Sequence, residues 1–178
     1  RRVPRVAGRN AADGLYSAQT SRLHDETLSL LFDLGCEQEA AQAVQSVIEP
    51  MMNNGQWETL SGWLSQLPER VRRDWPWLGY AEGELAAARG QTRSAQRIFA
   101  AATRAFTRNG DHGGAGRSLL NESILAARQN DLTRAEEFAR QARDLAEQAG
   151  LGWLQGWAGW QLACLAACAG KIEAAEAH

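Results

Sequence analysis

The stretch YAEGELAAARGQTRSA, from Tyr80 to Ala95, sets the pattern of this chain. Related stretches follow at residues 120–135 (LNESILAARQNDLTRA) and 160–175 (WQLACLAACAGKIEAA), so the pattern returns with a period of about 40 residues. A fixed period between about 20 and 50 residues is typical of repeat architectures, in which similar supersecondary units stack on one another.

Each copy carries the same residue types at the places where helices end and meet. A residue that tolerates the left-handed conformation after a helix stands at the same point of each copy, as Gly90, Asn130 and Gly170. Small residues recur seven positions before it and five positions after it, which allows two helices to approach closely: Gly83, Ser123 and Ala163, then Ala95, Ala135 and Ala175. The predicted fold class is therefore all-α. We expect a right-handed superhelical solenoid of antiparallel, tetratricopeptide-like helix pairs with repeats of about 40 residues.

Composition and periodicity agree with this fold. Windows rich in Ala, Leu, Arg, Gln and Glu favour helix, and no run of alternating β-branched and aromatic residues predicts a sheet. Arg70–Trp75 is interpreted as a connector and NGDHGGA (109–115) as a glycine-rich loop, while Thr92 and Asp131 are expected to cap helices. Helices are predicted at 22–34, 37–53, 56–66, 76–89, 92–108, 115–129, 132–148, 153–169 and 171–177.

The domain organisation follows from the same pattern. Residues 1–20 lack periodicity and are interpreted as a flexible arm or the remnant of a preceding domain. Residues 21–178 form the expected helical-repeat domain, irregular over 21–75 and regular over 76–178. Because the chain ends inside a helical pattern, we interpret it as a piece of a larger protein, truncated at the C-terminus. An apolar face exposed there favours self-association.

Charge and cysteine content exclude several classes of function. The net charge is −2 and the isoelectric point is near 6.0, and the short arginine clusters (Arg1-Arg2, Arg5, Arg9 and Arg70, Arg72, Arg73) suggest solvated charge. No direct contact with nucleic acid is therefore expected. No apolar run approaches the roughly 18 residues of a membrane span. Three cysteines, expected to be small buried thiols, fit a reducing, cytoplasmic compartment: Cys36, Cys164 and Cys168.

Motifs that carry catalysis are missing from the sequence. No phosphate loop of the GxxxxGK[ST] type, GxSxG, HExxH or CxxC is present. The three histidines, His24, His112 and His178, lie far apart, and His112 is interpreted as a solvated turn residue. We therefore expect a protein that is not an enzyme and that has neither a metal site nor a cofactor in this part of the chain.

The segment Leu23–Ala102 resembles a known family. A helix ending in the glycine turn of LFDLGCEQEAAQAV is followed by NNGQW, then WETLSGWLSQLPERV, then WPWLGYAEGELAAARGQTRSAQRIFAAA. This order is similar to the helical-repeat region of large ATP-binding LuxR-type transcriptional regulators, the maltose-regulon-activator-like family. The matching elements are Gly55 with Trp57, Trp63-Leu64, Leu67-Pro68, Pro76 with Leu78, and Gly90.

The resemblance implies a larger parent with an N-terminal nucleotide-binding switch domain and a C-terminal helix-turn-helix. ATP would then bind only that N-terminal domain, so neither the ATP site nor the DNA-reading helix falls on any residue of this sequence. What the resemblance implies for this region is the sensing of an inducer or the holding of a partner.

The repeat register also predicts a candidate groove. In stacked helix pairs the first helices line the concave face, so equivalent positions of successive repeats should lie side by side along it. Leu120 shares this face, and Ile124 and Cys164 follow one turn further on. The residues expected to form the binding groove are Trp77, Tyr80, Glu84, Arg117, Asn121, Trp157 and Trp160. Aromatic rings supply contact area there and the guanidinium supplies directional donors.

Two alternatives stay open at this stage. Trp157 and Trp160 fit the core as well as the groove, whereas Trp57 and Trp63 are expected to act as wedges between helices. The leading functional hypothesis is a sensor or interaction domain of a cytoplasmic transcriptional regulator that binds a small effector or a protein. The alternatives are a protein–protein scaffold unconnected to transcription and a piece of an enzyme complex.

Overall fold

The computed structural model describes residues 25–170, which are all-α and contain no strand. A first helix, seen over residues 25–33, precedes the others. The predicted helices are confirmed to within a few residues at each end. The helices are α2 (Glu37–Asn53), α3 (Trp57–Gln66), α4 (Glu69–Asp74), α5 (Pro76–Ala88), α6 (Thr92–Arg108), α7 (His112–Arg128), α8 (Leu132–Gln148) and α9 (Gly152–Cys168), of which α4 was not predicted. The expected arm (1–20) and last helix (171–177) lie outside the described residues.

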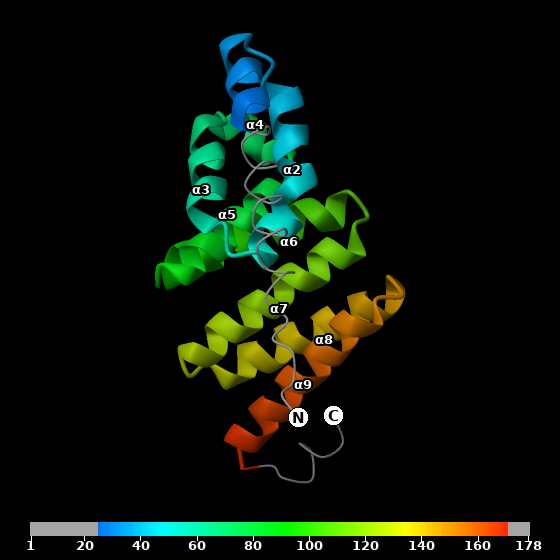
Figure 1. Cartoon of the computed structure of the whole chain (residues 1–178). Coiled ribbons are helices and arrows are strands. Elements are labelled where there is room, and N and C mark those ends of the chain that lie inside the picture. The colour runs from blue at the N-terminus through cyan, green and yellow to red at the C-terminus, as the bar shows by residue number, and fades with distance from the viewer. Residues whose placement is uncertain (1–24, 171–178) are drawn as a thin grey trace, which may run out of the picture.

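Helices α5 to α9 follow one another along the molecule, each packed on the one before, while α2, α3 and α4 gather at the N-terminal end (Figure 1). Alternate helices also touch, since α5 contacts α7 and α7 contacts α9. Helix α2 packs against α5 as well as against its neighbours α3 and α4. Positions of α5, α7 and α9 that are one repeat apart in the sequence therefore lie on helices that are in contact with each other.

The left-handed turns expected from the sequence are confirmed. Gly90, Asn130 and Gly170 have φ angles of +72°, +61° and +73°. Gly110 and Gly150 adopt the same conformation, with φ angles of +71° and +67°, so a further turn lies midway between each pair of predicted turns. Helices α6, α7, α8 and α9 are each 17 residues long, and three-residue turns separate them.

The same backbone hydrogen bond closes the turns at Gly90, Gly110, Asn130 and Gly150. The amide that follows the left-handed residue donates to a carbonyl five residues earlier, as in Gln91 to Ala86 (2.9 Å) and Asp131 to Ala126 (3.0 Å). This bond satisfies a carbonyl that the helix end would otherwise leave without a partner. A glycine or asparagine is favoured at these points because other residues pay a steric penalty in the left-handed region.

Three local predictions were wrong. The stretch 109–115 is not a loop, because α7 begins at His112, where Asp111 caps the helix by accepting the Gly114 amide at 2.8 Å. His112 is consequently a helical residue rather than a turn residue, and its ring nitrogen Nδ1 lies 2.9 Å from the Gln148 side chain. Thr92 is the first residue of α6 and not its cap. Asp131 does cap α8, accepting the Arg134 amide at 3.2 Å.

The predicted connector Arg70–Trp75 is the other correction to the helix boundaries, because most of it belongs to the short helix α4. Pro68 precedes α4 in an extended conformation, and Pro76 is the first residue of α5. Arg72 of α4 donates to the carbonyls of Leu64 and Leu67, at 2.8 and 2.6 Å, and so fastens α4 to the end of α3. A six-residue helix is marginal alone, and these tertiary contacts explain why it forms.

The cysteines also depart from expectation. Cys36 and Cys164 are only half-buried, and Cys168 is exposed near the end of α9. In residues 25–170 no three His, Cys, Asp or Glu side chains are placed to hold a metal ion. None of the helices described there is long and apolar enough to cross a lipid bilayer.

Small residues set the separation between neighbouring helices. Gly83 of α5 faces the ring of Phe99 on α6, and a Cβ atom at Gly83 would lie only 2.7 Å from that ring. Further along, the Ser123 hydroxyl donates to the Ala135 carbonyl across α7 and α8 at 2.7 Å. Ala95 and Ala135 are fully buried where the helices meet, as the sequence pattern predicts.

We expect Gly83→Ala to lower the free energy of unfolding by about 1–3 kcal/mol, because the added methyl group overpacks the contact with Phe99. Gly79 lies in the same helix and provides the matched control, since a Cβ atom there would meet no atom within 4 Å. Gly79→Ala should instead stabilise the chain by about 1 kcal/mol through helix propensity. Urea unfolding of both variants measures the difference, and equal effects would contradict this account of the packing.

A buried carboxyl group makes stability depend on pH. Glu122 of α7 is only 8% exposed and accepts a hydrogen bond from the Thr103 hydroxyl at 2.8 Å. Burial raises the pKa of Glu122 above its ordinary value near 4.5, and the bond from Thr103 together with the charges of Arg104 and Arg134 offsets part of this rise. The folded chain therefore binds this proton more tightly than the unfolded chain does.

Glu122→Gln should raise the melting temperature at neutral pH, because the amide resembles the protonated carboxyl that the buried site favours. The advantage should shrink as the pH falls through the raised pKa towards the ordinary value, where the wild-type carboxyl is also protonated. Glu137, exposed on α8, offers a control substitution that leaves this pH dependence unchanged. A constant difference between Glu122→Gln and wild type across the acid range would contradict the assignment.

Candidate ligand-binding groove

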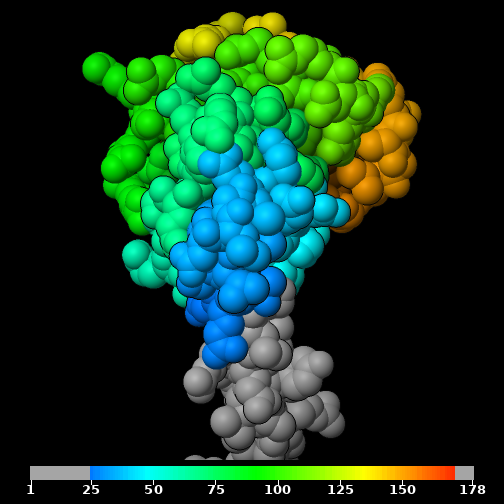
Figure 2. All heavy atoms as spheres, turned by 90° about the horizontal axis from the view of Figure 1, so that it is seen from above, coloured from blue at the N-terminus to red at the C-terminus, as the bar shows by residue number. Residues whose placement is uncertain are grey.

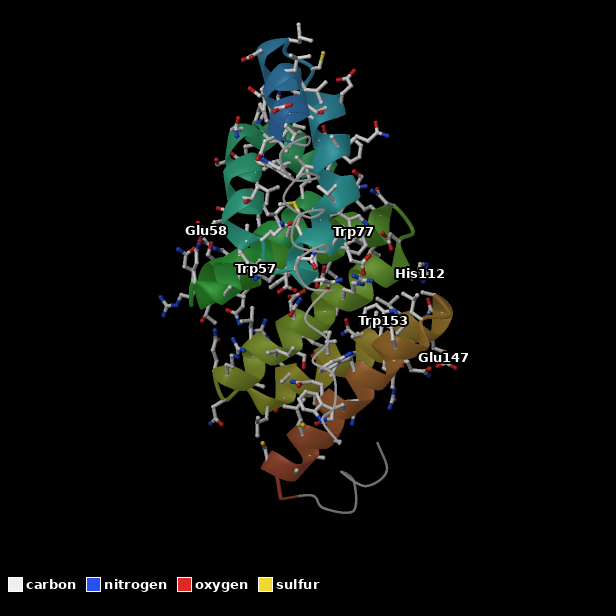
Figure 3. All side chains as sticks on the ribbon, viewed as in Figure 1. Trp57, Glu58, Trp77, His112, Glu147 and Trp153 are labelled. Carbon is white, nitrogen blue, oxygen red and sulfur yellow. The ribbon has the colours of Figure 1, made fainter. Side chains whose placement is uncertain are left out.

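A groove of about 460 Å³ lies between α2, α5, α7 and α9. Seen from above, the cyan end of α2 lies beside the orange start of α9, with α7 next to them (Figure 2). Trp77 and Trp153 lie on the same side of the molecule, whereas Trp57 and Glu58 lie on the other (Figure 3). Four helices that are distant in the sequence thus contribute side chains to one hollow.

Six of the seven side chains that the sequence predicted for the groove line it together. They are Trp77, Tyr80, Glu84, Arg117, Asn121 and Trp157, and Leu120 lies among them. The reason is the contact between alternate helices, which brings α5, α7 and α9 side by side. Trp160, Ile124 and Cys164 do not line the groove, although Trp160 packs edge-on against Trp157 with 5.6 Å between the ring centroids.

Arg117 of α7 is held in place by residues of three other helices that line the groove. Its guanidinium carbon lies 5.3 Å from the ring centroid of Trp77 and 4.5 Å from that of Trp153. Both of its terminal nitrogens approach Glu49 Oε1 of α2, at 3.3 and 3.2 Å. A cation stacked between two indoles and paired with a carboxylate has a fixed position, so this side chain links α2, α5, α7 and α9.

Trp77 is also held by residues other than Arg117. Its indole nitrogen donates to Asp111 Oδ2 at 3.2 Å, and its ring meets that of Phe106 edge-on at 4.9 Å and that of Tyr80 at 5.5 Å. Asp111 therefore has two tasks, since it also caps α7. These contacts fix the orientation of the indole that Arg117 contacts.

Tyr80, Glu84 and Asn121 form a closed hydrogen-bonded triangle in the groove. The Tyr80 hydroxyl donates to Glu84 Oε1 at 2.7 Å, while Asn121 Nδ2 donates to the Tyr80 oxygen at 3.1 Å and also to Glu84 Oε1. Burial, followed by the negative charge of Glu84, raises the pKa of Tyr80 far above its ordinary value near 10, so the hydroxyl stays neutral and remains a donor.

The tryptophans divide between core and surface. Trp63 is 5% exposed and its indole nitrogen donates to Asp25 Oδ1 at 2.6 Å, while Trp57 is partly buried against the same core, as expected for residues wedged between helices. Trp157 and Trp160 are 56% and 57% exposed, so the alternative that placed them in the core was wrong. Trp153, 48% exposed, belongs to the same aromatic face of α9.

Sequence reasoning missed two important groove residues. Trp153 precedes Trp157 by four residues and so shares its helix face, but the repeat register aligns it with Gly113, which gave no indication of a groove position. Glu49 lies on α2 in the irregular half, where no repeat register exists, and nothing in the sequence pointed to it. The other groove residues on α2, which include Gln45 and Asn53, were not predicted for the same reason.

Comparison with known proteins identifies no relative that would suggest a function for the groove. No protein-family model matches the chain, and no curated protein is significantly similar to it in sequence. The interpretation of the groove therefore depends on the side chains that form it.

The exposure of Trp157 predicts that its removal leaves the fold intact. We expect Trp157→Ala to change the free energy of unfolding by less than about 1 kcal/mol, since the side chain lies largely at the surface. The matched substitution Trp63→Ala, in the core, should cost about 3–5 kcal/mol. Thermal and urea unfolding of the two variants provide the measurement, and a collapse of Trp157→Ala would place its indole in the core after all.

Proposed function

We propose that this chain is a non-catalytic sensor domain whose helices form a right-handed, tetratricopeptide-like solenoid and whose groove binds a small effector. The equal lengths of α6 to α9, the evenly spaced left-handed turns and the contacts between alternate helices support the solenoid. The concave side of such an array is its usual binding surface, and the groove lies where α5, α7 and α9 run side by side.

The observation that carries the proposal is the convergence of aromatic and charged side chains from four helices on one hollow of about 460 Å³. That volume is within the range of about 300–1,000 Å³ that is typical of small-molecule sites. Such sites combine apolar walls with a few fixed polar groups. Trp77 and Trp157 supply the walls here, and the fixed polar groups are Arg117 and the triangle formed by Tyr80, Glu84 and Asn121.

The exposed indoles of α9 support binding independently. A single surface tryptophan needs no explanation, but three exposed on one helix, two of them in contact, give an apolar surface of the kind that marks interaction sites. Trp153 and Trp157 face the groove, and Trp160 extends the same surface beyond it.

Membership of a transcriptional regulator is the second part of the proposal, and it rests on the resemblance of Leu23–Ala102 to the repeat region of LuxR-type regulators. In a parent of that kind, binding of the effector in the groove would change the activity of a nucleotide-binding domain and a DNA-binding domain elsewhere in the protein. Both the cytoplasmic location and the confinement of ATP to another domain belong to this proposal.

A protein–protein scaffold is the alternative, and one observation favours it. Trp160 is exposed outside the groove, so the aromatic surface is longer than a small molecule requires and would suit a peptide. A partner that covered Trp160 as well as Trp157 would fit this alternative better than an effector confined to the groove.

Intrinsic tryptophan fluorescence and thermal unfolding of the chain, measured against a panel of small metabolites and oligosaccharides, test the proposal. We expect a saturable spectral change together with a higher melting temperature, because a ligand that prefers the folded state stabilises it. Trp157→Ala should weaken that binding at least about tenfold, whereas Trp57→Phe, on the other side of the molecule, should not. If no compound of the panel binds, or if Trp157→Ala leaves the binding unchanged, the result would count against a small effector in this groove.

A further inference from the structure

The groove has an unbalanced charge. Its charged lining residues are Glu49, Arg117 and Glu84. Glu49 and Arg117 neutralise each other at 3.2 Å, whereas Glu84 makes no ion pair within residues 25–170. Glu84 is half-buried, and a carboxylate removed from water is costly unless an opposite charge accompanies it. The groove as it stands is therefore complementary to a cation.

An account of donors and acceptors in the triangle leads to the same conclusion. A carboxylate only accepts hydrogen bonds, so the Asn121 atom that faces Glu84 must be the nitrogen. The Tyr80 hydroxyl hydrogen is then used inside the triangle, and Asn121 Nδ2 donates to both of its oxygens. Glu84 Oε2 and Asn121 Oδ1 remain, and neither makes a hydrogen bond within the described part of the chain. Both of these oxygens are acceptors, so they favour a ligand that donates hydrogen bonds.

The aromatic walls favour a cation too. Arg117 shows this directly, because its guanidinium already stacks on the rings of Trp77 and Trp153. The ring of Trp157 is 56% exposed, so much of its surface is accessible to a ligand, and it lines the same groove as Glu84. Aromatic rings beside an unpaired carboxylate are the combination by which proteins bind organic ammonium groups.

We infer that the groove binds a primary ammonium group carried on an apolar or aromatic body. The ammonium donates to Glu84 Oε2 and Asn121 Oδ1, and the body lies against the indoles of the groove, Trp157 above all. This inference rests on the proposed function and specifies its ligand class. A neutral polyol would also donate hydrogen bonds but would leave the charge of Glu84 uncompensated. A carboxylate ligand would have to compete with Glu49 for Arg117, which is already stacked on two rings.

Three probes of nearly equal size separate these ligand classes: 2-phenylethylamine, 2-phenylethanol and phenylacetate. At neutral pH they are a cation, a neutral alcohol and an anion on the same phenyl body. We expect calorimetric titration of the whole chain to show that the amine binds at least about tenfold more tightly than either of the others. The preference should weaken with added salt, since it is electrostatic.

Two variants assign the preference to Glu84. Glu84→Gln keeps an oxygen to accept from Tyr80 and Asn121 but replaces the free carboxylate oxygen with an amide donor, so the amine should lose its advantage while the melting temperature changes little. Glu58→Gln, exposed on α3 and outside the groove, removes the same charge elsewhere and should leave amine binding unchanged. If both variants lost the preference equally, the net charge of the chain and not Glu84 would be responsible.

The outcomes separate this inference from the proposed function. Tightest binding by phenylacetate would overturn the inference in favour of recognition by Arg117. Equal binding of all three probes, or no binding of the amine, would overturn it as well. If the amine fails while a neutral metabolite from the panel binds and is weakened by Trp157→Ala, the sensor proposal stands without the inference. If neither the probes nor the panel bind, both are wrong.

Discussion

The spacing of the left-handed turns is the constraint on which the rest of this structure depends. From α6 onwards, a helix of 17 residues and a three-residue turn make one unit, and Gly90, Gly110, Asn130, Gly150 and Gly170 mark the unit ends. Equal helices and equal turns place each helix against the next in the same way. With this spacing α5 contacts α7 and α7 contacts α9, so groove residues that are one repeat apart lie on touching helices.

The regular half alone does not make the groove. Helix α2 of the irregular half crosses its N-terminal side and contributes Glu49, which pairs with Arg117 of α7. The equal units thus produce an open row of side chains, and the unequal part closes one end of it. A ligand that filled this hollow would contact α2 and α9 together and would oppose any movement that separates them, because binding would favour the arrangement that makes both contacts.

How far the sequence predicted this arrangement follows from the same division. The period indicated the class of the fold, the turn residues and the side chains that α5 and α7 contribute to the groove, since each of these depends on local spacing that the chain repeats. The stretch 109–115 was wrongly predicted to be a loop because it contains three glycines, whereas the cap at Asp111 and the contact of Gly114 with Phe106 allow a helix to begin at His112. Glu49 and α4 escaped prediction because tertiary contacts in a non-repeating region determine them.

Arg117 shows how a substitution at one repeat position introduces charge into the groove. The equivalent positions in the neighbouring units carry Trp77 and Trp157, so an aromatic row is interrupted by a single cation, which stacks on the ring of Trp77. With Arg117 paired to Glu49, the charge that is left belongs to Glu84, further along α5 and fixed by Tyr80 and Asn121. Had Glu84 been apolar, like Ile124 at the equivalent position, the hollow would be electrically neutral and selective only for shape. The selectivity for charge that we propose would therefore depend on Glu84.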